Sequence, residues 1–165
     1  MREHCPAELK TIAEARRWII ESAVALKACK CPVCGQTAKL YPRKLSAGLA
    51  RLLVDICRQT KDYPPRDRWV NISKDLIVHS DHPIPRDYSI LRFWGLLEPA
   101  AGCPAHWRIT DTGIAFVEGR MEVPRLIYLY NNNCIRMGTK TINCSDALKS
   151  EFRLKPMLEE EEEIE

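Results

Sequence analysis

Between Ser46 and Gly119 the sequence sets out a succession of helix, strand and turn signals that few small folds accommodate. Leu49, Leu53 and Ile56 recur at helical spacing, and short β-branched or aromatic stretches alternate with later helical patterns. We expect first a helix over residues 46–59, a strand over 68–72 and a helix over 74–79 after Ser73. A helix over 86–97 should follow, and then two strands joined by a loop over 102–105, the second strand over 107–110. The last element should be a helix over 111–118, which Asp111 caps and Gly119 ends.

This succession is the order of a winged helix-turn-helix, in which three helices precede a β-hairpin wing and the third helix enters a DNA major groove. In the expected third helix, one face at i, i+4, i+7 should pack inward and carries Ile90, Trp94 and Leu97. The opposite face should point to solvent or DNA and carries Arg86, Ser89 and Arg92.

Basic residues dominate the body of the chain. Six of the 22 acidic residues lie within residues 159–165, so the remainder carries 25 Lys and Arg against 16 Asp and Glu. A surface this basic favours a polyanionic partner, and nucleic acid is the usual one. We therefore predict DNA binding, with phosphates neutralised by Arg43, Lys44, Arg51 and Arg108.

Two segments resemble the winged-helix regulators of the MarR type. Residues 91–98, which contain Trp-Gly-Leu-Leu-Glu, resemble the end of their recognition helix, and residues 107–119 resemble their second wing strand with the helix after it. Residues 30 to 155 or so are also similar to small uncharacterised phage and prophage proteins, in which a CPxCG turn, a basic segment like 41–45, a winged helix and a closing hairpin recur. The resemblance implies a phage-encoded regulatory or accessory protein and brings no established activity.

Eight cysteines without a secretory signal are better explained as metal ligands or buried thiols than as disulfides. Cys57, Cys134 and Cys144 fit buried thiols. Cys31 and Cys34 have the spacing at which two thiolates bind one tetrahedral zinc ion, and Gly35 permits the tight turn that this requires.

A zinc site needs four ligands, and the best second pair by local chemistry is Cys103 with His106, which repeats the same spacing. Cys29 and Cys5 are alternatives. His4 is a poorer one, because a straight helix rising 1.5 Å per residue would hold it about 35 Å away. With four protein ligands the zinc is structural, since no position is left for water or substrate.

The expected class is α+β: a winged helix-turn-helix core with an N-terminal helix, a zinc-knuckle turn, and a C-terminal β-hairpin with a short helix. We divide the chain into an N-terminal helix at 1–28, a zinc-knuckle segment at 29–44, a winged-helix domain at 45–120, a β-hairpin and helix at 121–156, and an acidic disordered tail at 157–165. No apolar run approaches the ~20 residues of a membrane span, and no secretory signal is recognisable, so we expect a cytoplasmic protein.

The sequence is compatible with two functions. DNA binding, with a homodimer reading two half-sites, is the first. The alternative is a protein-binding module, such as an inhibitor of a host machine, that contacts its partner through the acidic tail or the apolar hairpin at 126–130. We find no nucleophile with its base, no paired carboxylates and no phosphate-binding glycine loop, and therefore predict that the chain is not an enzyme.

Overall fold

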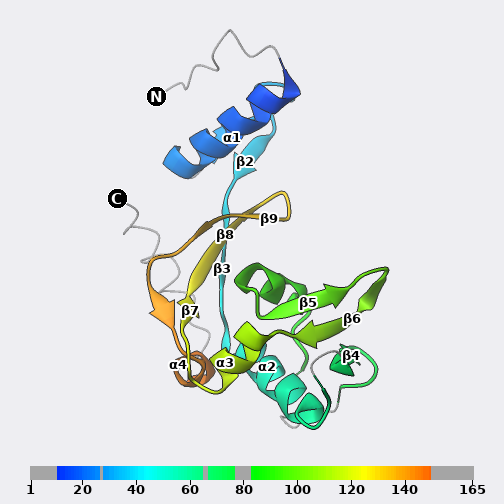
Figure 1. The fold of residues 1–165 in the computed structure, drawn as a ribbon. Coiled ribbons are helices and arrows are strands. Elements are labelled where there is room, and N and C mark those ends of the chain that lie inside the picture. Colours follow the sequence, from blue (N-terminus) through cyan, green and yellow to red (C-terminus); the bar gives the residue numbers. More distant parts are fainter. Residues whose placement is uncertain (1–10, 27, 65–66, 77–82, 150–165) are drawn as a thin grey trace. The chain divides into compact units, whose positions relative to one another are not determined.

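The protein is an α+β chain, described here from a computed structural model (Figure 1). The structure describes residues 11–26, 28–64, 67–76 and 83–149. It divides into two compact units. Unit 1 comprises Met1–Lys44 with Leu126–Thr139, and unit 2 comprises Leu45–Arg125 with Lys140–Glu165. The hairpin near the C-terminus therefore groups with the N-terminal part of the chain.

Unit 1 begins with helix α1 (Ile12–Leu26). A capping box starts it: Thr11 Oγ1 accepts a hydrogen bond from the Glu14 N–H at 3.1 Å, and Glu14 Oε2 accepts one from the Thr11 N–H at 2.8 Å. The sequence predicts a helix from Pro6 to residue 28, whereas the observed helix is shorter at its C-terminal end because Ala28 already begins strand β1 (Ala28–Lys30). Residues 1–10 lie outside the described part.

The buried stripe of α1 covers a two-stranded hairpin. Ala15, Ile19 and Ala23 recur every four residues and are at most 6 % exposed. Strand β1 pairs antiparallel with β2 (Thr37–Lys39), and α1 packs against both strands. Cys29 and Lys30 belong to β1, so the tight turn predicted at Cys31 and Cys34 begins directly after this strand.

A three-stranded antiparallel sheet completes unit 1, with strand order β3 (Tyr41–Lys44), β8 (Leu126–Tyr130), β9 (Asn133–Met137). The β8–β9 hairpin predicted from the sequence is confirmed. Its turn contains Asn131 and Asn132 with φ of 47° and 58°, as a tight hairpin turn requires and as asparagine tolerates. The basic segment of β3 pairs with β8 across more than 80 residues of sequence.

Unit 2 is centred on helix α2 (Ala47–Thr60), which Ser46 caps by accepting a hydrogen bond from the Leu49 N–H at 3.4 Å. The predicted inward residues of this helix are 0–3 % exposed and are Leu49, Leu52, Leu53 and Ile56. Helices α3 (Asp111–Val117) and α4 (Cys144–Lys149) pack on α2. Strands β7 (Val123–Pro124) and β10 (Thr141–Ile142) form a short antiparallel pair, in which β7 follows α3 and β10 precedes α4 along the chain.

A second three-stranded antiparallel sheet in unit 2 has the order β4 (Trp69–Asn71), β6 (Cys103–Ile109), β5 (Leu97–Ala100). One face of this sheet is buried through Val70, Trp107 and Ile109. After β4, the Asn71 carbonyl accepts from the N–H groups of Lys74 and Asp75 at 3.1 and 2.8 Å. Of the helix predicted over 74–79, residues 74–76 are described and form no helix, and residues 77–79 lie outside the described part.

The segment before the β5–β6 hairpin is a 3₁₀ helix, η2 (Tyr88–Trp94), and not the α-helix over 86–97 that the sequence predicts. Because a 3₁₀ helix has three residues per turn, its inward row contains Tyr88, Leu91 and Trp94. Leu91 is 0 % and Trp94 is 6 % exposed. Of the residues predicted to face inward, Trp94 and Leu97 are buried, whereas Ile90 is half-buried; Leu97 lies in β5 and not in the helix.

Two residues fix the end of η2 against the start of α3. Gly95 adopts φ 69° and ends η2. The Thr110 hydroxyl donates to the Gly95 carbonyl at 2.5 Å and accepts from the Gly113 N–H at 2.9 Å, so Thr110, and not Asp111, caps α3. A Cβ built on Gly113 would meet the Leu96 carbonyl oxygen and would lie 2.7 Å from Ile109 Cγ1.

Among the described residues, no helix is both long and apolar enough to cross a membrane.

Candidate functional site

The β1–β2 hairpin closes through a turn that carries Cys31 and Cys34. The Cys31 N–H donates to the Gln36 carbonyl at 2.7 Å, and the Gly35 N–H donates to the Cys31 carbonyl at 2.9 Å. Gly35 has φ 72°, which a residue with a side chain rarely adopts. We call residues 31–36 the knuckle turn.

The knuckle turn favours a thiolate at Cys31. Backbone N–H groups of Cys34 and then Val33 donate to its sulfur, the Cys34 side chain adds a further hydrogen bond, and together they lower the pKa of Cys31. Hydrogen bonds to the charged form of a group stabilise that form. Cys34 is exposed, Cys31 is half-buried, and Val33 between them is 76 % exposed. The sulfur atoms of Cys31 and Cys34 thus lie on an accessible tip.

Cys29 faces the other way. Its side chain is 5 % exposed, and its sulfur donates to the Ile19 carbonyl of α1 at 3.6 Å. Its strand partner Ala38 is also buried. This orientation places Cys29 in the packing beneath α1 and argues against it as a third ligand of the knuckle turn. His4 and Cys5 lie outside the described residues.

Cys103 and His106 lie together, as their spacing predicts for a ligand pair. Cys103 Sγ is 2.9 Å from His106 Nδ1. A register shift in the β5–β6 pairing brings them together, because Ala100 pairs with Cys103 while Pro99 pairs with Trp107. On one tetrahedral zinc ion, a sulfur at ~2.3 Å and a nitrogen at ~2.0 Å would be ~3.5 Å apart. A small side-chain rotation would therefore suffice for both to bind one ion.

The two pairs belong to different units: Cys31 and Cys34 to unit 1, Cys103 and His106 to unit 2. That they share one zinc ion stays a prediction. In the part of the chain that the structure describes, no cluster of three or more His, Cys, Asp or Glu side chains suited to a metal ion is found.

The residues predicted to read DNA lie along η2 and the turn before it. Arg86 is exposed, and Ser89 and Arg92 are half-buried. The guanidinium of Arg92 lies over the Phe93 ring, 4.7 Å from its centroid. Their three-residue spacing matches a 3₁₀ helix, so Ser89 and Arg92 form a row apart from the buried row of Leu91 and Trp94.

Arg108 has intramolecular partners on the exposed face of the β4-β6-β5 sheet. Its Nε donates to Glu98 Oε1 at 2.6 Å within an ion pair, and its guanidinium lies 4.6 Å from the Trp69 ring centroid. Trp69 and Glu98 are its direct neighbours on the two flanking strands. The sequence analysis missed this cluster, because cross-strand register is not visible in a single segment. The ion pair reduces the charge that Arg108 offers to a phosphate.

The other predicted phosphate contacts are spread over both units. Arg51 is half-buried on α2 in unit 2. Arg43 is exposed and Lys44 half-buried on β3 in unit 1. The structure therefore groups Arg51, Arg86, Ser89, Arg92 and Arg108 in one unit, and leaves Arg43 and Lys44 in the other.

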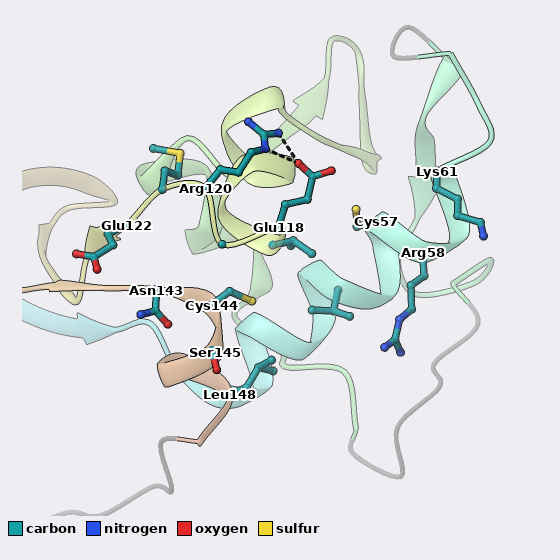
Figure 2. Close-up of a pocket in the computed structure, with 14 residues that line it drawn as sticks. Cys57, Arg58, Lys61, Glu118, Arg120, Glu122, Asn143, Cys144, Ser145 and Leu148 are labelled. Carbon is teal, nitrogen blue, oxygen red and sulfur yellow. Dashed lines mark hydrogen bonds and ion pairs between the residues drawn. The ribbon is translucent and has the colours of Figure 1, made fainter.

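Unit 2 also contains a cleft of about 810 Å³ between the C-terminal half of α2, residues 117–122 and the start of α4 (Figure 2). Burial raises the pKa of Cys57 and of Cys144, which line it, so both stay protonated thiols. Glu118 and Arg120 form an ion pair at its edge. Of the three cysteines predicted to be buried thiols, Cys144 is buried, whereas Cys57 and Cys134 are half-buried.

Comparison with known protein families, with curated proteins and with solved structures finds no match. Any function must therefore be inferred from the geometry of the chain itself.

Proposed function

We propose that the chain is a zinc-binding winged-helix protein that binds DNA through η2 and the turn before it. The observation that carries this proposal is the row containing Ser89 and Arg92, which continues to the exposed Arg86 and lies apart from the buried Leu91 and Trp94. A helix fixed by one row and presenting arginines on another is what groove recognition requires.

The sheet of unit 2 supports the winged-helix interpretation. In the winged-helix order, the strand after the first helix pairs with the second strand of the wing hairpin. Strand β4, which follows α2, pairs antiparallel with β6, and β6 pairs with β5 as a hairpin directly after η2. The wing tip, residues 101–102, carries no basic side chain, so the tip itself should not supply phosphate contacts.

Net charge supports DNA as the partner. The chain outside residues 159–165 carries an excess of nine positive charges by its Lys, Arg, Asp and Glu content. Such a surface raises the local concentration of a polyanion and gives binding that weakens steeply with salt. In the proposed role the zinc is structural and holds the knuckle turn, in keeping with the resemblance to small phage regulatory or accessory proteins.

Replacing Arg86 and Arg92 together with alanine tests the proposal. Each lost phosphate contact should lower the steepness of the dependence of log affinity on log salt by about one, and we expect the affinity for mixed-sequence duplex DNA to fall at least tenfold. Fluorescence anisotropy at two salt concentrations measures both. The thermal midpoint should not change, because neither side chain is in the core.

The matched control removes two other arginines, Arg16 and Arg17, which are exposed on α1 in unit 1. It changes the net charge by the same amount and should lower affinity far less. If the η2 variant keeps the affinity of the unaltered protein, or if both variants lose it equally, η2 is not the DNA-binding surface.

One observation favours the alternative, a protein-binding module. Both outer strands of the β3-β8-β9 sheet carry an exposed apolar side chain, Tyr41 at 57 % and Met137 at 46 %, and an outer strand can pair with a strand of a partner. Capture from a nuclease-treated host lysate separates the two functions. A stable protein partner together with no DNA affinity would favour the alternative.

A further inference from the structure

We propose that the knuckle turns of two copies of this chain bind one zinc ion between them, so that Cys31 and Cys34 of each copy supply its four ligands and zinc joins the copies. The inference deepens the zinc binding proposed above and rests on it. It states which residues supply the second pair of zinc ligands.

The first support is the position of the sulfur atoms. Cys31 and Cys34 lie at the end of a two-stranded hairpin, and Val33 between them is 76 % exposed although it is apolar. A zinc ion held by two thiolates on such a tip has two further positions for ligands from whatever approaches. A second identical tip would supply two thiolates and cover both Val33 side chains.

The second support is the orientation of the neighbouring thiol. Cys29 is only two residues from Cys31, but its sulfur donates to the Ile19 carbonyl under α1. The hairpin therefore directs one cysteine into its own packing and two to its tip.

The third support is charge. Lys30 and Lys39 are exposed on the two strands of the same hairpin, and Lys30 Nζ donates to Thr37 Oγ1 at 2.8 Å. Two tips brought together would place the two Lys30 side chains near one another, with the Lys39 side chains two residues further from the turn, and this charge opposes association without metal. Four thiolates around Zn²⁺ carry a net charge of −2, which these lysines would offset. The association should therefore depend on the metal.

The competing ligand pair is Cys103 with His106 in unit 2, which lie 2.9 Å apart and would complete the site within one chain. The two arrangements differ in stoichiometry. A site shared by two copies contains one zinc for two chains, whereas a site completed within one chain contains one zinc for each chain.

The experiment uses the full chain purified with zinc. Metal analysis gives the ratio of zinc to protein, and light scattering after size exclusion gives the mass. We expect 0.5 zinc per chain and a dimer, and a chelator should convert the dimer to monomers. Replacing both Cys103 and His106 with alanine should leave ratio and mass unchanged, whereas Cys34→Ser should lose both zinc and dimer.

Cobalt provides a readout that needs no substitution, should Cys34→Ser fail to fold. The sulfur-to-metal absorbance of bound Co²⁺ grows with the number of thiolates, so the intensity should match four sulfurs per ion and a ratio of 0.5. One metal ion per chain, a monomer that holds zinc, or zinc that is lost with Cys103 and His106 would overturn the inference. A chain that binds DNA as proposed but holds no zinc would overturn it too, and would leave the DNA-binding proposal standing.

Discussion

At the scale of single residues, Thr110 and Gly113 show how a short sequence fixes the end of η2 to the start of α3. The Thr110 hydroxyl serves two elements at once, capping α3 and holding the Gly95 carbonyl at the end of η2. Gly113 permits the close approach, because a methyl group there would meet the Leu96 carbonyl and Ile109. The Thr-Asp-Thr-Gly segment thus serves helix capping and close packing.

Gly113→Ala should therefore destabilise the protein. Overpacking of a close contact typically costs 1–3 kcal/mol, and here one of the neighbours is backbone, so we expect a loss of about 2–3 kcal/mol in the free energy of unfolding by chemical denaturation. The control is Gly48→Ala in α2, where the new methyl group would lie 3.3 Å from Pro85 Cγ. If the two substitutions had equal effects, the close packing at Gly113 would be refuted.

At the scale of elements, the sequence predicts what is local and misses what depends on the rest of the molecule. Helix α2 follows from its cap Ser46 and its apolar spacing, and the β8–β9 hairpin from its strands and asparagine turn. The 3₁₀ conformation of η2, in place of an α-helix, could not be predicted from its own residues. Its three-residue period follows from packing of Leu91 and Trp94 and from the Trp94 indole, whose Nε1 donates to the Pro124 carbonyl at 2.6 Å.

The same limit applies to the candidate site. The spacing of Cys31 with Cys34, and of Cys103 with His106, predicted which residues lie together, because each pair is close in sequence. The Trp69–Arg108–Glu98 cluster and the cleft beside α2 come from segments tens of residues apart. Strand register and tertiary packing bring these segments together, and neither can be predicted from a short stretch of sequence.

The period of η2 can be tested by comparing two adjacent substitutions. Leu91 is fully buried and Ile90 is half-buried. Leu91→Ala should cost about 2–5 kcal/mol of unfolding free energy, as full truncations in a core do, and Ile90→Ala clearly less. An α-helix with Ile90 facing inward predicts the reverse order, so a larger loss for Ile90→Ala in the same denaturant titration would contradict the 3₁₀ description.

At the scale of the whole molecule, the two proposed functions fall in different units. Unit 1 carries the knuckle turn, and unit 2 carries η2 with Arg92 and the preceding turn with Arg86. The proposed zinc-linked pair of chains would join two copies of unit 2, and two DNA-binding surfaces on one assembly bind more tightly than one. DNA binding by η2 and the turn before it is the central proposed function of the chain.

Hydrogen exchange of the full chain with and without duplex DNA tests that claim most directly. Bound DNA should slow exchange of backbone amides in η2 and the turn before it, residues 86–95, and less strongly in β5 and β6. The amides of α1 should exchange at unchanged rates. Protection confined to β8 and β9, or no protection in residues 86–95 at a DNA concentration that saturates binding, would contradict the account.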